Sequence, residues 1–95
     1  MTIFFTNTAK NDLYAINDFI AADKPAAAAD FLDELLTRIE LLKTNPFQCR
    51  KSYYSDKPNV RDLVFKGYTV VYRVQEDRIE ILKIFNQNRL GEIKE

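Results

Sequence analysis

Residues 60–86 constrain the fold most, because they divide into three short stretches in which apolar and polar side chains alternate. Leu63 and Phe65, for example, share one side of the first stretch. Alternation with a period of two is typical of half-buried β-strands. The first connection is Lys66-Gly67, a pair suited to a tight hairpin because glycine adopts positive φ freely. The segment therefore predicts a three-stranded meander.

The last of these stretches differs from the other two. It alternates at first and then becomes apolar on both sides, up to Phe85. A strand with two apolar sides is usually covered on both. We therefore expect this strand to lie in the middle of the sheet.

The first part of the chain predicts a strand and then two helices. Residues 1–6 are rich in β-branched and aromatic residues, which favour a strand. Apolar side chains then recur at steps of three and four between Ala9 and Ile20, as on one face of a helix. Pro25 suits the first position of a second helix, and Pro46 excludes helical geometry from the residue before it. Residues 8–44 are thus expected to form a helical hairpin.

The elements follow the order β-α-α-β-β-β, so the fold class is α+β. We expect one domain over residues 1–95, in which an antiparallel sheet packs against the N-terminal helical hairpin. Residues 46–59 are interpreted as a loop, and residues 87–95 as a polar tail.

Residue counts exclude several kinds of chemistry. The 95 residues include no histidine, one cysteine and two glycines. A Ser-His-Asp triad, a Cys-His pair and histidine or cysteine-cluster metal sites are therefore impossible. Neither glycine-rich nucleotide-binding motif occurs. We expect no cofactor, and any catalysis would depend on arginine, lysine, tyrosine or carboxylate groups.

The same counts bear on location. Cys49 is the single cysteine, so the chain cannot form an internal disulfide, and no apolar run is long enough to span a membrane. A cytoplasmic protein is expected.

Charge is distributed unevenly, although the formal net charge is zero. Residues 1–42 contain three basic and seven acidic side chains, whereas residues 43–95 contain eleven basic and seven acidic ones. The second half could meet an anionic partner. The alternative is that both halves simply carry solvated charges.

Two long segments together resemble one known family. FFTNTAKNDLYAINDFIAADKPAAAADFLDEL resembles the opening of ParE-type toxins of the RelE/ParE toxin–antitoxin superfamily. VRDLVFKGYTVVYRV, followed by IEILKIFNQNR, resembles the sheet of the same toxins. The resemblance runs from Thr2 to about Arg89 and implies a RelE/ParE-like fold.

Within that superfamily, RelE-type members cleave mRNA on the ribosome, whereas ParE-type members are thought to inhibit DNA gyrase by binding it. The positions that carry basic or histidine residues in the nucleases are here Val60, Asp62, Thr69 and Asn86. The resemblance therefore favours a gyrase-binding toxin over an enzyme. The alternatives are a ribosome-dependent mRNA interferase and a non-toxic interaction module of the same fold.

The resemblance also implies a partner. A cognate ParD-like antitoxin would neutralise the toxin through an acidic C-terminal segment and would bind operator DNA through a ribbon-helix-helix N-terminus. The toxin would contact operator DNA only through this antitoxin, as in modules for plasmid stabilization.

Candidate residues for contacts with the antitoxin or the target come from the second half of the chain. Arg61 could instead form an ion pair at the rim, and Arg73 could lie over apolar surface or pair with a helix acid. Tyr53 and Lys51 belong to a loop of basic and aromatic residues, which could bind nucleic acid or could simply pack on the sheet. Arg89 lies in the polar tail, where a solvated side chain is the alternative.

Overall fold

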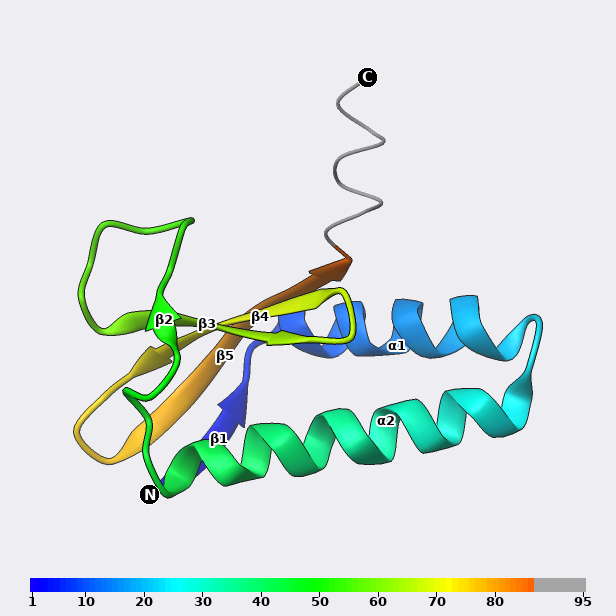
Figure 1. The fold of residues 1–95 in the computed structure, drawn as a ribbon, viewed down its shortest axis with the longest axis horizontal. Helices are drawn as coiled ribbons and strands as arrows, with labels where there is room; N and C mark the ends of the chain where they lie inside the picture. Colours follow the sequence, from blue (N-terminus) through cyan, green and yellow to red (C-terminus); the bar gives the residue numbers. More distant parts are fainter. Residues whose placement is uncertain (87–95) are drawn as a thin grey trace.

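The computed structural model describes residues 1–86. Its elements, in chain order, are β1 (Thr2–Phe5), α1 (Asn7–Ala21), α2 (Pro25–Glu40), a 3-10 turn η1 (Leu41–Lys43), β2 (Arg50–Lys51), β3 (Val60–Phe65), β4 (Tyr68–Val74) and β5 (Arg78–Asn86) (Figure 1). The predicted α+β class and the order of the predicted elements are confirmed. The predicted tail, residues 87–95, lies outside the described residues.

The helical hairpin begins at Thr6, which caps α1. Its hydroxyl accepts a hydrogen bond from the backbone N–H of Ala9 and donates one to the carbonyl of Leu82 in β5. The Thr6 side chain thus accepts a hydrogen bond from a backbone N–H that has no partner within the helix, and it also joins the first turn of α1 to the sheet. Pro25 opens α2, as predicted. The connection between the helices projects beyond the sheet, at the right of Figure 1.

The sheet contains five strands in the order β1-β5-β4-β3-β2. The prediction of an antiparallel sheet was wrong at one edge, because β1 runs parallel to β5 while the other pairs are antiparallel. Hairpin turns fix the direction of β3, β4 and β5, but a strand joined by a long helical connection can run parallel. As expected, β5 lies inside the sheet.

The segment predicted as a loop between residues 46 and 59 also contains the short strand β2. Arg50 of β2 stands opposite Asp62, and Lys51 stands opposite Arg61. Two residues are too few to show a period of two, so the sequence pattern could not reveal this strand.

The turn between β3 and β4 has the geometry that its sequence predicts. Lys66 has φ of 48° and Gly67 has φ of 85°. Two successive positive φ values are typical of the tight hairpin turns that match the twist of the strands.

A register shift separates Val71 from Tyr72 on β4, opposite β5. Tyr72 pairs with Ile81 and Val71 pairs with Lys83, so Leu82 is the extra residue of a bulge. The bulge explains the run of apolar residues in this strand, because the side that faces the helices changes there.

The core lies between the sheet and the helical hairpin. Its sheet residues share one face, and its helix residues belong to the predicted apolar stripes; the main members are Ala9, Ile16, Leu35, Ile39, Leu63, Phe65, Val70, Tyr72, Ile79, Ile81 and Ile84. The helical hairpin therefore covers this face of the sheet over the core residues.

The edge of β5 beyond the end of β1 is blocked by polar groups from the helical hairpin. The carboxylate of Asp12 in α1 accepts the backbone N–H of Ile84 at 2.8 Å, next to the bond from Thr6 to Leu82. Backbone groups satisfied in this way cannot pair with another strand.

Candidate functional site

The face of the sheet opposite the helices is the main candidate for a binding surface. We call it the open face. Strand pairing places on it residues from four strands: Phe4, Asp62, Val64, Thr69, Val71, Arg73, Arg78, Glu80, Lys83 and Phe85. Phe4 and Val64 remain exposed, while Thr69 and Val71 are buried. The face is therefore neither a plain solvated surface nor a closed core.

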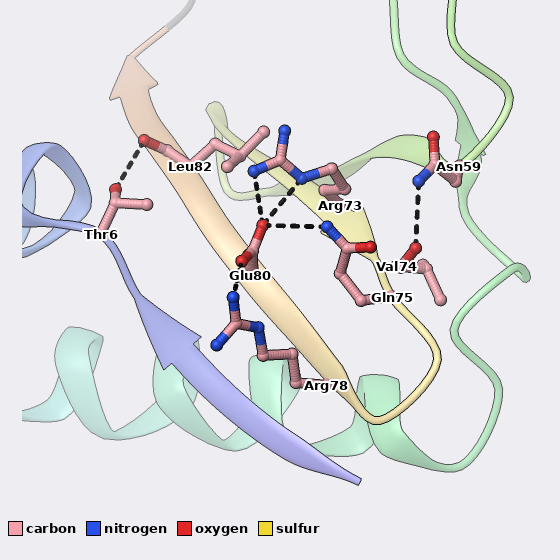
Figure 2. Close-up of polar contacts among 8 residues, drawn as sticks. All are labelled: Thr6, Asn59, Arg73, Val74, Gln75, Arg78, Glu80 and Leu82. Atoms are coloured by element: carbon pink, nitrogen blue, oxygen red, sulfur yellow. Dashed lines mark hydrogen bonds and ion pairs between the residues drawn. The ribbon is translucent and has the colours of Figure 1, made fainter.

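Glu80 organises the charges at one end of the open face. Its Oε1 accepts a hydrogen bond from Nε of Arg73 at 2.7 Å and also lies 2.5 Å from Nη2 of that arginine. Its Oε2 lies 2.6 Å from Nη2 of Arg78, and Gln75 adds a longer contact of 3.5 Å (Figure 2). One carboxylate thus holds two guanidinium groups from neighbouring strands.

The burial of Glu80 depends on these partners. Only 7% of its side chain is exposed. The hydrogen bond from Arg73 lowers the pKa of the Glu80 carboxyl, against the effect of burial, which raises it. Glu80 is thus held in its ionised form at neutral pH.

An apolar hollow lies beside this cluster. It has a volume of about 410 Å³ and is lined by Tyr54, Val71, Lys83 and Phe85. The rings of Tyr54 and Phe85 meet edge to face with centroids 5.1 Å apart. Three apolar side chains and one cation form a site that could accept an apolar side chain next to an acidic group.

Asp62 is the second buried carboxylate of the open face. Its Oδ2 accepts the backbone N–H of Tyr53 at 3.0 Å and two contacts from the guanidinium of Arg50 at 3.3 Å. That guanidinium also lies 3.8 Å from the ring centroid of Tyr53. Asp62 therefore fixes the start of the loop that follows β2.

Arg61 does not form the rim ion pair that is the alternative to a partner contact, within the described part of the chain. Its guanidinium donates to the backbone carbonyls of Phe47, Cys49 and Pro58, and lies 4.9 Å from the ring centroid of Phe47. It faces the helix side of the sheet, next to Tyr72. Arg61 thus holds the loop that precedes β3.

Tyr72 supports the same loop from inside. Its hydroxyl donates to the carbonyl of Pro46 at 2.6 Å, and the residue is fully buried. Burial raises the pKa of the Tyr72 phenol above its ordinary value. The phenol is therefore a structural donor.

The other predicted contact residues are placed as follows. Arg73 pairs with Glu80 of a neighbouring strand, not with a helix acid. Tyr53 is 74% exposed, and Lys51 is exposed on the edge strand. Arg89 lies outside the described residues. The structure brings Arg73 into the Glu80 cluster but places Lys51 and Arg61 elsewhere.

The positions that carry nuclease residues in RelE-type toxins have other roles here. Val60 is buried and apolar, Asp62 is paired with Arg50, and Thr69 is fully buried. Asn86 ends β5. Val60, Asp62 and Thr69 are thus occupied with packing or an ion pair.

Within residues 1–86, no set of acidic residues and cysteine lies close enough together to hold a metal ion. In the same residues, no helix has the length and apolarity needed to cross a membrane.

Comparison with known proteins identifies the family. A family model for the ParE toxin of the type II toxin–antitoxin system parDE matches residues 3–91. The chain belongs to the ParE toxin family. A structure described as the chromosomal ParDE toxin–antitoxin system from P. aeruginosa resembles this ParE-family toxin with a TM-score of 0.76 and 26% identity. The match covers 90% of this chain and 95% of that one.

Two more distant structures share the fold of this ParE-family toxin. A chain of the RelBE2 toxin–antitoxin complex from Mycobacterium tuberculosis matches with a TM-score of 0.60 and 20% identity, over 90% of this chain and 95% of that chain. A conserved hypothetical protein from Helicobacter pylori matches with a TM-score of 0.50 and 14% identity, over 93% and 96%. No curated protein matches the chain.

Sequence reasoning missed most of the open-face site. Glu80 was not singled out, although it follows Arg78 by two residues on the same side of a strand, which is a readable signal. Tyr54 and Phe85 meet across more than thirty residues of chain, and no local pattern predicts that contact.

Proposed function

We propose that this ParE-family toxin inhibits DNA gyrase by binding it, without cleaving RNA, and that a cognate antitoxin neutralises it. The observation that carries the proposal is the composition of the open face in a chain of this family. That face presents cations held by buried carboxylates and an apolar hollow, in a chain that contains no histidine.

Binding, as opposed to RNA cleavage, is supported by what the polar groups of this face do. Cleavage needs a general base whose pKa lies near neutrality and a second group to protonate the leaving oxygen. Glu80 has a lowered pKa and is occupied by two arginines, and Asp62 is occupied by Arg50 and a backbone N–H. Glu80, with its lowered pKa, is therefore not suited to accept a proton at neutral pH.

The antitoxin is proposed from family membership and from the resemblance to a ParDE toxin–antitoxin system. Its acidic C-terminal segment would meet the basic second half of the toxin, and its N-terminal part would bind operator DNA. Arg73 is the predicted contact residue that lies on the open face.

A supercoiling assay tests the proposed target. Purified toxin is added to gyrase and relaxed plasmid over a wide concentration range. We expect a dose-dependent loss of supercoiling that is prevented when the antitoxin encoded beside the toxin is added first. Unchanged supercoiling at all concentrations, with folded toxin confirmed by circular dichroism, would refute gyrase as the target.

A further inference from the structure

We infer that Arg73, Glu80 and Arg78 form a binding site for a carboxylate of an acidic protein segment, and that a neighbouring apolar side chain of that segment enters the hollow beside Val71. This inference rests on the proposed antitoxin partner and identifies the part of the toxin that recognises its acidic segment.

The two arginines keep hydrogen-bond donors beyond those that hold Glu80. A guanidinium carries five N–H donors. The contacts with Glu80 use Nε and Nη2 of Arg73 and Nη2 of Arg78. Figure 2 shows the remaining nitrogen of Arg73 directed away from the carboxylate. An incoming carboxylate can therefore be bound without displacing Glu80.

Exposure decides which charge a partner meets. The side chain of Glu80 is 7% exposed, whereas those of Arg73 and Arg78 are 38% and 47% exposed. The negative group lies inside and the two positive groups lie outside. These three side chains alone therefore have one positive charge in excess, while the exposed acids Glu76 and Asp77 lie in the turn directly before Arg78.

Glu80 and Phe4 also hold the arginines in place before a partner arrives. The guanidinium of Arg78 lies 5.3 Å from the ring centroid of Phe4, and its Nη2 is bonded to Glu80. Side chains that are already ordered lose less conformational entropy on binding. Glu80 is thus a positioning residue for this site.

The hollow adjoins the cluster along β4. Val71 and Arg73 are two residues apart on the same side of the strand, which separates them by roughly 7 Å. Lys83 stands opposite Val71 and contributes a cation to the hollow. An acidic segment with alternating apolar residues would match this order of apolar and positive groups.

The surroundings favour a carboxylate over the phosphates of a nucleic acid. Binding to nucleic acid depends on several cations that neutralise successive phosphates. Here Glu80 cancels one of the two arginine charges, so the cluster of Arg73, Arg78 and Glu80 has a single excess charge and not a row of several. An isolated carboxylate beside an apolar side chain is the better match for one excess charge and a hollow.

Fluorescence anisotropy with a defined probe tests the inference. The probe is a short fluorescein-labelled peptide in which glutamate pairs alternate with leucine pairs, and its control has glutamine in place of glutamate. We expect the acidic peptide to bind the complete chain and the control peptide to bind at least about tenfold more weakly. Single-stranded RNA should not displace the peptide.

Two variants assign the binding to this cluster. Arg73→Gln with Arg78→Gln should weaken peptide binding at least about tenfold. This double variant leaves the buried carboxylate of Glu80 without its arginine partners. A triple variant therefore adds Glu80→Gln, which lowers the net charge by one and leaves no unpaired carboxylate at this position. Lys10→Gln in the helical hairpin also lowers the net charge by one and should leave the affinity unchanged.

Three results would overturn the inference. They are absence of peptide binding to the unmodified chain, equal affinity in the triple variant and in Lys10→Gln, and displacement of the peptide by RNA through the same arginines. The assay contains no gyrase, so a chain that binds the peptide but leaves supercoiling intact would contradict the proposed target only.

Discussion

Two acidic side chains buried on the open face determine how its charges are arranged. Glu80 and Asp62 are each less than a tenth exposed, and each is held by arginine. A buried carboxylate is costly unless it is paired and hydrogen-bonded. Each pair is therefore expected to be needed for stability, and Glu80 also positions two groups for binding.

Glu80→Gln should lower the free energy of unfolding by roughly 1–2 kcal/mol at pH 7, because the charged hydrogen bonds are lost. The pKa of Glu80 is lowered from its ordinary value of 4.5, so the stability gained from its ionised form is present above that pH. It is lost as the pH falls through the lowered pKa. Urea unfolding should therefore show the two proteins converging at acidic pH.

Glu76→Gln, in the exposed turn before β5, is the control for this substitution and should change stability little at either pH. A difference between the Glu80 variant and the unmodified protein that grows on acidification would contradict the assignment.

Asp62→Ala should destabilise the protein by about 2–3 kcal/mol, because Arg50 and the backbone N–H of Tyr53 both lose their acceptor. Asp56→Ala, in the exposed part of the same loop, is the matched control. Thermal unfolding would measure both. Equal melting temperatures would show that Asp62 does not hold the loop.

At the scale of elements, contacts between α1 and β5 join the helical hairpin to the sheet. Thr6 caps the helix and bonds to Leu82, and Asp12 accepts from Ile84. No local pattern indicates the contact of Thr6 with a residue 76 positions further along the chain. Local patterns report local partners, so long-range bonds of this kind cannot be predicted from them.

Thr6→Ala should cost about 1–2 kcal/mol, since a helix cap and a bond to the sheet are lost together. Thr8→Ala, an exposed position inside the first turn of α1, should cost much less. Chemical denaturation compares the two variants. A larger loss for Thr8 would contradict the placement of the cap.

Gly67→Ala should destabilise the hairpin by about 1 kcal/mol although the space around Gly67 is open. The reason is its φ of 85°, which a residue with a side chain adopts only at a cost. Lys66→Gly, at the preceding turn position with φ of 48°, should be neutral or slightly stabilising. Thermal melts of the two variants would test the turn.

The helices and strands also show how much of the fold could be predicted from the sequence. The hydrophobic periods of three, four and two predicted both helices, β3, β4 and β5 within a few residues. They did not predict β2, which is too short to show a period, or the direction of β1, which no turn fixes. The site was less predictable, because the open face assembles from four strands and a loop, and only Arg73 among its residues was anticipated.

At the scale of the whole molecule, one face of the sheet is closed by the helical hairpin and the other presents cations, two buried carboxylates and an apolar hollow. This arrangement supports recognition of other proteins. It provides no imidazole in any part of the chain, and its acidic groups are committed to arginines. The central claim of the proposed function is that the toxin acts by binding and not by cutting RNA.

Primer extension on mRNA from translating ribosomes tests this claim most directly. The purified chain is added to programmed ribosomes beside a RelE-type nuclease as the positive control. We predict that the nuclease produces cuts at defined codons and that this chain leaves the message intact at the same concentration. Codon-specific cuts by this chain, at rates far above background, would contradict the account.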